Sequence, residues 1–316
     1  MKLKHRGFIS TREGFSKGIL QMAHNHPNLI GIGSDITTSV GMDKFAKAFP
    51  ERFYSLGIAE QNAITVAAGM ALCNKIPFVA SYATFIAMRT LDQIRVSVCY
   101  NNLNVKIGGA HAGISVGPDG ATHQALEDIA ALRALPNMTI LSPADATQTE
   151  KAVKAAVEHN GPVYIRYGRE PMPDFTYSDE NFNIGKSHIY SEGKDCVIFA
   201  TGHLVWEALL ANEHLKNNGI HCTVVNVYSL KPIDIETIES TARLCKCAVT
   251  AEEHQITGGL FSAISETLAT HYPIPIEPVG MNNSFGESGK PQELMSKYKM
   301  NAEAIVEAVI KVLKKK

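Results

Sequence analysis

Short apolar runs alternate with longer amphipathic segments through the first half of the chain, and this rhythm strongly limits the possible folds. Runs of this length are typical of strands, whereas the amphipathic segments have the spacing of helices. Parallel strands need long crossover connections, so the alternation predicts a mostly parallel sheet with helices on both faces. The expected strands are LIGIG, FYSLG, FVASY, VKIGG, MTILS and VYIRY. The first expected helix begins near Thr11, and the others cover 60–73, 91–100, 124–135 and 144–159.

A second alternation follows a segment without periodicity. The segment EPMPDFTYSDENF contains two prolines and several acidic residues, which is typical of an interdomain linker. With 316 residues, 45% of them hydrophobic, the chain can form two ordinary cores. We predict an α/β protein of two doubly wound domains, at 1–172 and 187–316, joined by a linker at 173–186. The later strands are CVIFAT, CTVVNV, CAVTAE and IPIEPVG, and the later helices cover 205–216, 235–243, 260–270 and 302–314.

The overall charge excludes several classes of partner. Thirty Lys and Arg residues against 31 Asp and Glu residues give a net charge of -1, so no global field favours nucleic acid or an acidic membrane. The longest apolar run, from Ala63 to Cys73, is too short to span a bilayer. Six cysteines without an apparent signal peptide favour reduced thiols and a cytoplasmic protein.

Polar residues gather at the ends of the first predicted strands, where open α/β sheets place their ligands. GSDITTS follows the first strand and contains Asp35 and Ser39, although a simple polar turn would explain it as well. Glu60 begins an otherwise apolar helix in SLGIAEQNAITVAAGMAL. A carboxylate suits a helix N-terminus for electrostatic reasons alone, but apolar surroundings would also let it hydrogen-bond a ligand nitrogen.

The densest polar cluster is the glycine-rich segment HAGISVGPDGATHQALED. His111, Asp119 and His123 all lie in this one predicted loop between a strand and a helix. A single histidine is more often a hydrogen-bonded surface residue, but two histidines and an aspartate together favour a polar binding site. Metal binding by these residues is an alternative with weaker support.

The same loop matches the GxSxG pattern of serine hydrolases at Gly113, Ser115 and Gly117. A nucleophile elbow requires a strand that runs directly into the serine and a helix that leaves directly after it. Here a glycine, Pro118 and an aspartate interrupt the exit, which favours a chance match. A serine hydrolase that uses Ser115 stays open as an alternative from another functional class.

Two arginines follow the last strand of the first half, in VYIRYGRE. The planar guanidinium of Arg166 or Arg169 suits a phosphate or a carboxylate. A pair of arginines in surface ion pairs is an equally good interpretation of the sequence alone.

Taken together, GSD, GIAEQ, SYATF, HAG with GPDGATHQ, and IRYGRE occur in an order that resembles the pyrimidine-binding and C-terminal domains of transketolase. The resemblance covers essentially the whole chain. The chain looks like the C-terminal half of a transketolase encoded as two subunits. The resemblance implies transfer of a two-carbon ketol unit from a ketose phosphate to an aldose phosphate.

The sequence contains no GDG motif, which in this superfamily helps to hold a divalent metal and the diphosphate of thiamine diphosphate. The resemblance therefore implies a separate N-terminal subunit that supplies the diphosphate site and most of the ligands for Mg²⁺ or Ca²⁺. It also implies a heterotetramer of two copies of each subunit and a chain that is inactive alone.

The resemblance assigns cofactor contacts to four residues. Glu60 would hydrogen-bond the aminopyrimidine ring and help to activate the thiazolium carbon, Phe85 would stack on the pyrimidine, and Asp35 and Met88 would lie near the cofactor. The cofactor then supplies the carbanion chemistry, and the protein supplies orientation and electrostatics.

The resemblance assigns substrate contacts to five residues. His111 and His123 would be catalytic and would contact the hydroxyl and carbonyl groups of the sugars. Asp119 would bind a hydroxyl next to the reacting carbon, and Arg169 with Ser39 would bind the distal phosphate.

Decarboxylating members of the same superfamily are the nearest alternative. GIAEQN also fits deoxyxylulose-phosphate synthases and the beta subunits of 2-oxo acid dehydrogenases, whereas His111 before AGISVGPDG, and THQ, favour ketol transfer. A regulatory or scaffolding subunit is a non-enzymatic alternative. The resemblance implies a chiefly structural second domain, so we expect no catalytic role for Glu252, Glu253 or His254 in EEHQITGG.

Overall fold

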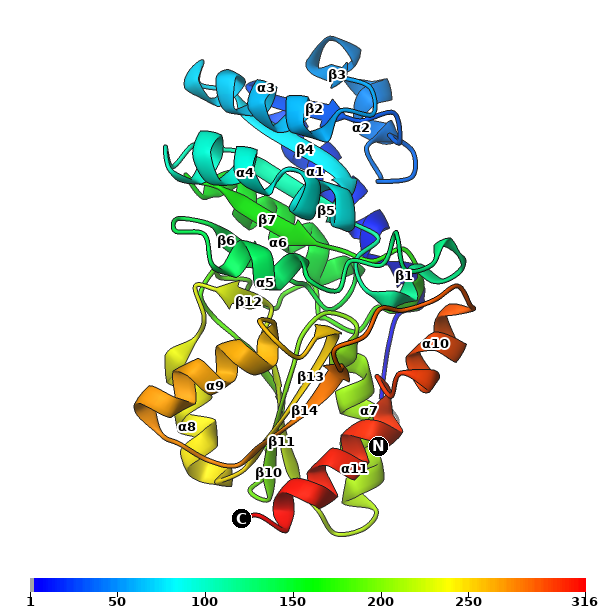
Figure 1. Ribbon diagram of the computed structural model, residues 1–316, viewed down its shortest axis with the longest axis vertical. Helices are drawn as coiled ribbons and strands as arrows, with labels where there is room; N and C mark the ends of the chain where they lie inside the picture. Colours follow the sequence, from blue (N-terminus) through cyan, green and yellow to red (C-terminus); the bar gives the residue numbers. More distant parts are fainter. Residues whose placement is uncertain (1–2) are drawn as a thin grey trace.

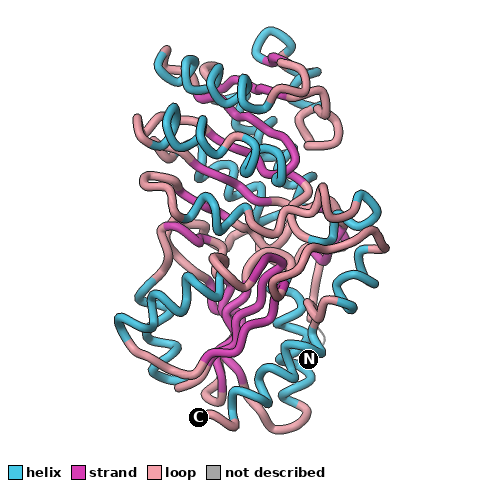
Figure 2. The backbone as a smooth tube through the Cα atoms, in the orientation of Figure 1, coloured by secondary structure: helices cyan, strands magenta, loops and turns pink. Residues whose placement is uncertain are grey.

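Two α/β domains, each built on its own sheet, form the computed structural model, which describes residues 3–316 (Figure 1). The strands form two separate groups, one in each half of the molecule (Figure 2). This architecture confirms the predicted α/β fold with mostly parallel sheets. Within the described residues, no helix is both long enough and apolar enough to cross a bilayer.

The first sheet has seven strands in the order β12-β6-β7-β5-β4-β2-β3. All neighbours pair in parallel except β12, which is antiparallel to β6. The six strands predicted in the first half of the sequence are all present. They are β2 (Leu29–Gly33), β3 (Phe53–Ser55), β4 (Ile76–Tyr82), β5 (Lys106–Ala110), β6 (Thr139–Leu141) and β7 (Val163–Arg166).

Helices cover both faces of this sheet, as expected for parallel strands. Ser10 begins the first helix, where its hydroxyl accepts a hydrogen bond from the Glu13 amide at 3.2 Å. One face carries α1 (Thr11–Asn25), α2 (Asp43–Ala48) and α6 (Ala146–Glu158), and the other carries α3 (Glu60–Leu72), α5 (Asp128–Arg133), the three-residue α4 (Leu91–Gln93) and the π-helices η2 (Thr84–Arg89) and η3 (Ile94–Cys99).

Two predicted helices differ from the structure. The helix expected at 91–100 is mostly π-helical after its first turn. The helix expected at 124–135 begins only at Asp128, because tertiary hydrogen bonds hold the preceding residues. The side chain of Gln124 donates to the Glu287 carbonyl at 2.9 Å, and the Gln255 amide donates to the Leu126 carbonyl at 2.8 Å.

The second sheet has five strands in the order β14-β13-β10-β11-β9, of which only β9 pairs antiparallel. Residues 174–187 precede it and contain no helix or strand. The strands are β9 (His188–Ser191), β10 (Cys196–Ala200), β11 (Cys222–Asn226), β13 (Ala248–Gln255) and β14 (Ile276–Met281), and the helices are α7 (Leu204–Lys216), α8 (Ile235–Cys245), α9 (Leu260–His271), α10 (Pro291–Lys297) and α11 (Ala302–Leu313).

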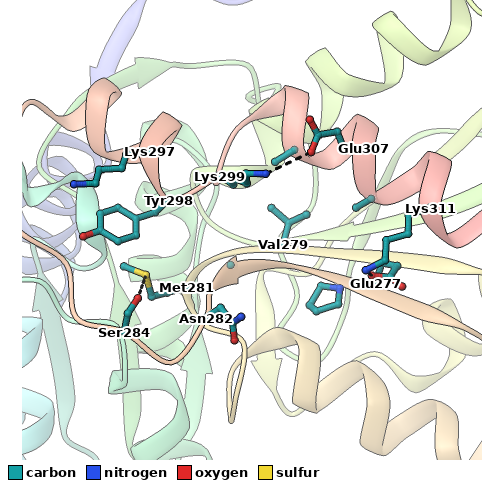
Figure 3. A pocket seen from close by; sticks show the side chains of 14 residues that line it. Glu277, Val279, Met281, Asn282, Ser284, Lys297, Tyr298, Lys299, Glu307 and Lys311 are labelled. Carbon is teal, nitrogen blue, oxygen red and sulfur yellow. Dashed lines mark hydrogen bonds and ion pairs between the residues drawn. The ribbon is translucent and has the colours of Figure 1, made fainter.

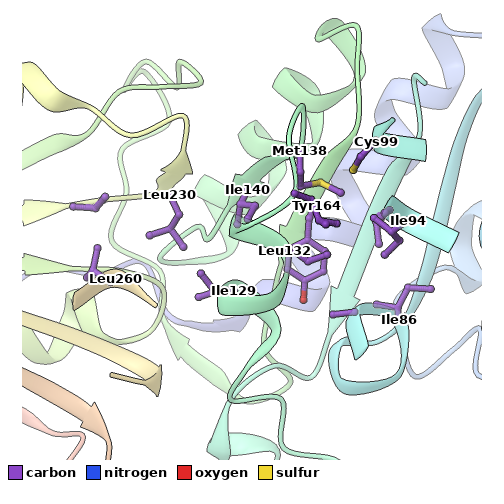
Figure 4. Packing of buried hydrophobic residues seen from close by; sticks show 14 of the residues in the cluster. Ile86, Ile94, Cys99, Ile129, Leu132, Met138, Ile140, Tyr164, Leu230 and Leu260 are labelled. Atoms are coloured by element: carbon purple, nitrogen blue, oxygen red, sulfur yellow. The ribbon is translucent and has the colours of Figure 1, made fainter. Parts of the chain in front are cut away.

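A short strand ties the two halves together. The strand β12 (Ser229–Lys231) follows β11 in the chain but joins the first sheet. Within the first half, β1 (Phe8–Ser10) pairs with β8 (Pro171–Pro173) as a separate two-stranded sheet. The apolar core is also continuous between the domains: side chains from α5 and β6 lie in one cluster with Leu230 and Leu260 of the second domain (Figure 4). The sequence pattern did not predict β1, β8, β9, β12, α2 or α10, all of which are short.

A buried charged network lies where the domains meet. Arg166 is only 6% exposed, and its Nε donates to Asp128 Oδ2 at 2.9 Å. Tyr164 donates to the same carboxylate oxygen at 2.7 Å, and His254 of β13 lies 3.9 Å from Asp128 Oδ1. Arg166 is therefore neither a surface ion pair nor an available phosphate ligand, contrary to both interpretations of the sequence, because Asp128 neutralises it inside the protein.

His254 makes the stability of this junction dependent on pH. Burial lowers the pKa of His254 from 6.5 to about 4, so at pH 5 the folded protein keeps the imidazole neutral whereas the unfolded chain protonates it. The contribution of His254 to stability is complete above pH 6.5 and declines as the pH falls towards 4. We predict that, between pH 7 and pH 5, the unmodified protein loses about 2 kcal/mol more unfolding free energy than His254→Gln does, as measured by urea titration.

The exposed His214 provides the matched control, since His214→Gln changes a histidine that is already in solvent. Its pH dependence should equal that of the unmodified protein. The account of His254 is wrong if His254→Gln loses as much stability between pH 7 and pH 5 as the unmodified chain.

Candidate functional site

The candidate site lies at the carboxyl edge of the first sheet, where the neighbouring strands β7, β5, β4 and β2 end. Parallel pairing brings these ends together although they are far apart in the sequence. Ser39 lies in the loop after β2, Tyr82 ends β4, His111 follows β5, and Arg169 lies beyond β7. The clustering of polar residues at strand ends that the sequence predicted is therefore present.

Tyr82 is the centre of an aromatic cluster. Its ring centroid lies 4.5 Å from that of His111, 5.8 Å from Phe85 and 5.9 Å from His123. The Tyr82 hydroxyl is hydrogen-bonded to Ser39 Oγ at 2.8 Å. The structure thus brings four predicted site residues around Tyr82, which the sequence pattern did not indicate; they are Ser39, Phe85, His111 and His123. Tyr82 ends the expected strand FVASY and lies three residues before Phe85.

His111 is held in an unusual state. Its backbone φ is +54°, a left-handed conformation that is uncommon for residues other than glycine, and the residue is only 1% exposed. Burial, followed by the charges of Arg12 and Arg169, lowers its pKa from 6.5 to about 4. Within the described residues neither ring nitrogen has a well-formed hydrogen bond, although an interaction with the Ser39 backbone partly opposes the lowering of the pKa. A neutral imidazole is therefore largely left for a ligand to satisfy.

Asp119 and Arg169 lie at the edge of the cluster and face each other. Arg169 Nη1 is 3.3 Å from Asp119 Oδ2, and both side chains remain partly exposed. The sequence predicted separate ligand contacts for these two residues. The structure shows in addition that they form an ion pair, so a phosphate at Arg169 would compete with a carboxylate.

Glu60 begins α3 with only 2% of its surface exposed. Ser81 Oγ donates to one carboxylate oxygen at 3.1 Å, and Arg89 Nη1 lies 2.6 Å from the other. The expected apolar environment is therefore wrong in one respect, because a charged partner from η2 reaches the carboxylate. The Arg89 guanidinium also lies 4.6 Å from the Phe85 ring centroid, so it links the two predicted cofactor residues.

Asp35 and Met88 lie outside this arrangement. Asp35 is exposed and its carboxylate accepts a hydrogen bond from the Ser55 hydroxyl at 2.8 Å. The Met88 side chain, on the same π-helix as Phe85, is 44% exposed. Among residues 3–316, neither forms a hydrogen bond, ion pair or ring contact with the aromatic cluster.

Ser115 does not have the surroundings of a hydrolase nucleophile. It lies in the short helix η4 (Ile114–Asp119), five residues beyond the end of β5 at Ala110, and its backbone amide donates to Glu253 Oε1 at 2.6 Å. Its hydroxyl is buried and has no hydrogen-bond partner in the part of the chain that the structure describes. The Ser–His contact that activates such a nucleophile is therefore not formed.

A separate cavity of about 440 Å³ lies along β14 in the second domain (Figure 3). Its lysines are matched by glutamates: Lys311 Nζ is 2.7 Å from Glu277 and Lys299 Nζ is 3.9 Å from Glu307. A third lysine of the lining, Lys297, pairs with Glu287 beside the cavity. Because each lysine already has a glutamate partner, we assign no ligand to the cavity. No group of three or more His, Cys, Asp or Glu side chains in residues 3–316 is arranged to hold a metal ion.

Comparison with protein families matches both domains. Residues 8–173 match the pyrimidine-binding domain of transketolase, and residues 185–305 match the transketolase C-terminal domain. A putative transketolase C-terminal section from Methanocaldococcus jannaschii is 41% identical over 96% of each chain. A 6-deoxy-6-sulfo-D-fructose transketolase subunit from Clostridium sp. strain MSTE9 is 37% identical over 96% of this chain and 95% of its own length.

A solved structure agrees with these matches over the whole chain. The structure of a split-gene transketolase, described as an inactive beta4 tetramer, superposes with a TM-score of 0.90 at 45% identity, covering 98% of this chain and 99% of that one. The chain therefore belongs to the transketolase family, and it consists of the pyrimidine-binding domain followed by the C-terminal domain.

Proposed function

We propose that this chain is the C-terminal subunit of a transketolase that transfers a two-carbon ketol unit from a ketose phosphate to an aldose phosphate. The observation that carries the proposal is the group formed by the buried carboxylate of Glu60, the ring of Phe85 and the neutral, unsatisfied imidazole of His111. Transketolases depend on thiamine diphosphate, and in this proposal Glu60 and Phe85 would provide a carboxylate and an aromatic ring for its pyrimidine, while His111 would face the substrate.

On the cofactor side, Glu60 would hydrogen-bond the aminopyrimidine ring and Phe85 would stack against it. The buried carboxylate fits this role because its position is fixed at the start of α3 and by Ser81. The cofactor, when bound, supplies the carbanion chemistry, while Glu60 holds a proton at the ring nitrogen. Asp35 and Met88 would border this site at a greater distance.

On the substrate side, His111 and His123 would bind and orient the hydroxyl and carbonyl groups of the sugars. A neutral imidazole can both donate and accept a hydrogen bond, which suits a hydroxyl better than an imidazolium does. Asp119 would bind a hydroxyl next to the reacting carbon. Arg169 and Ser39 would bind the distal phosphate, for which a guanidinium provides two parallel donors.

A separate N-terminal subunit would complete the site by holding the diphosphate and most of the metal ligands, for Mg²⁺ or Ca²⁺. One relative is named as a transketolase subunit, and the similar split-gene structure is a tetramer of one kind of chain that is inactive. Both support an enzyme that needs two different chains, and we propose a heterotetramer with two copies of each. We place it in the cytoplasm, since all six cysteines are free thiols.

The assembled enzyme provides the test of this function. The purified chain is mixed with the product of the matching N-terminal gene, thiamine diphosphate and magnesium, and ketol transfer from xylulose 5-phosphate to ribose 5-phosphate is measured. Each component is omitted in turn. Activity that requires both chains and the cofactor supports the proposal, whereas bound cofactor with decarboxylation of pyruvate and no ketol transfer would favour the decarboxylating alternative.

Glu60→Gln tests the role assigned to the buried carboxylate. The amide can still accept a hydrogen bond from Ser81, so the fold should survive, but it cannot hold the proton at the cofactor ring. We predict that kcat of the assembled enzyme falls roughly 10²- to 10⁴-fold.

The control is Glu158→Gln, which changes an exposed glutamate at the end of α6 and should leave kcat unchanged. Thermal unfolding of both variants shows whether the fold is retained. A Glu60→Gln enzyme with normal kcat would contradict the assignment and would favour a scaffolding role for the chain.

Ser115→Ala separates ketol transfer from the hydrolase alternative. The contact of Ser115 with Glu253 uses the backbone amide, which alanine also has, so we predict less than about a threefold change in ketol transfer. A serine-directed fluorophosphonate should not label the unmodified chain. Labelling at Ser115 together with loss of activity in Ser115→Ala would support a hydrolase instead.

A further inference from the structure

Glu253 of the second domain lies under the loop that carries the proposed substrate residues. This loop, which we call the substrate loop, comprises residues 111–123. Ser115 N donates to Glu253 Oε1 at 2.6 Å, and His203 Nδ1 lies 3.4 Å from Glu253 Oε2. The Glu253 side chain is only 3% exposed, so both contacts are formed away from bulk water.

The neighbouring residues of β13 have different roles. Successive side chains of a strand point to opposite faces, so Glu252 and His254 lie on the face away from Glu253. Glu252 accepts hydrogen bonds from the amides of Leu260 and Phe261 at 2.6 and 2.8 Å, and therefore caps α9. Only Glu253 of this acidic pair reaches the substrate loop through its carboxylate.

The Glu253 carboxylate is a strong acceptor. Burial disfavours its charged form, but the hydrogen bond and interaction with His203, together with the charge of Arg166, lower its pKa below the usual 4.5. A hydrogen bond to an ionised carboxylate in a buried site is shorter and stronger than one between neutral groups. The contact with Ser115 is therefore well suited to hold a loop in place.

The substrate loop is held only in part by its own backbone hydrogen bonds. Gly113 N donates to the Ala125 carbonyl at 2.9 Å and Gly120 N to the Gly117 carbonyl at 3.1 Å, whereas Ser115 N, between them, donates to Glu253 instead. Gly113, Gly117 and Gly120 have φ values of +87°, +77° and +78°, which glycine adopts readily and other residues rarely do. At Gly113 the backbone approaches so closely that an added Cβ would lie 2.3 Å from the Glu253 carboxyl carbon. The second domain thus fits against the loop between His111 and Asp119.

We propose that Glu253 is a positioning residue that orders the substrate loop through the Ser115 amide and thereby sets the geometry of His111, Asp119 and His123. The proposal rests on the proposed function, because the loop matters for catalysis only if these residues bind the sugars. It assigns the second domain a part in catalysis that the resemblance to transketolase did not imply for it.

The first test uses the chain alone and does not depend on activity. Amide hydrogen exchange is measured across residues 111–123 in the unmodified chain, in Glu253→Ala and in the control Glu252→Gln, which changes the adjacent buried glutamate on the opposite face. We expect exchange in the loop to rise about tenfold or more in Glu253→Ala, with β5 and β10 unchanged, and to stay unchanged in Glu252→Gln. Equal exchange in all three chains would overturn the proposal.

The second test uses the assembled two-chain enzyme. Glu253→Ala should lower kcat/KM for ketol transfer roughly tenfold to a hundredfold without changing thiamine diphosphate affinity, because only the substrate residues lose their positions. Glu253→Gln keeps an oxygen acceptor for the Ser115 amide and should recover most of the loss. An unchanged kcat/KM in Glu253→Ala would refute the positioning role while leaving the proposed function intact.

Gly113→Ala provides an independent variant, since its methyl group would occupy the position of the Glu253 carboxylate. If both changes act by separating the loop from Glu253, the double variant Gly113→Ala with Glu253→Ala should lose no more than about threefold beyond the worse single variant. Fully multiplied losses would contradict a shared mechanism. If the unmodified pair of chains transfers no ketol unit at all, the proposed function fails, and the exchange measurement alone decides whether Glu253 orders the loop.

Discussion

Parallel pairing of β7, β5, β4 and β2 is the constraint on which the rest of the site depends. It brings the carboxyl ends of four strands to one edge, so residues from Ser39 to His123 meet around Tyr82. The strands hold their ends rigidly, whereas the loops that follow are free to carry polar groups. The buried carboxylate of Glu60 and the neutral imidazole of His111 can exist there because the sheet and its helices exclude water from both.

The junction between the domains has a comparable importance. Arg166 and Asp128 neutralise each other, and Arg166 also donates to the backbone carbonyls of Ala125 and Glu253, so a charged network is buried without an unpaired charge. The same strand of the second domain that completes this network places the Glu253 carboxylate beneath Ser115. Domain packing and the shape of the proposed substrate loop are therefore parts of one arrangement, and a change at the junction should reach the site.

Sequence reasoning predicted the regular elements well and the interactions between them poorly. Alternation of apolar runs located the parallel strands, and amphipathic spacing located the first helix near Thr11, since both signals are local. The late start of α5 and the pairing of β12 with the first sheet depend on contacts made only after folding. For the same reason the sequence indicated Glu60 and His111 but not Arg89, Tyr82 or Glu253, whose significance comes from what they contact.

The central claim is that the site is shared between two chains, with the pyrimidine contacts on this chain. Calorimetric titration of thiamine diphosphate, in the presence of magnesium, into this chain, into the N-terminal subunit and into their equimolar mixture tests it most directly. The account predicts saturable binding with one site per pair of chains in the mixture, and binding that is much weaker or absent in this chain alone. Binding of equal affinity to this chain alone and to the mixture would contradict a shared site.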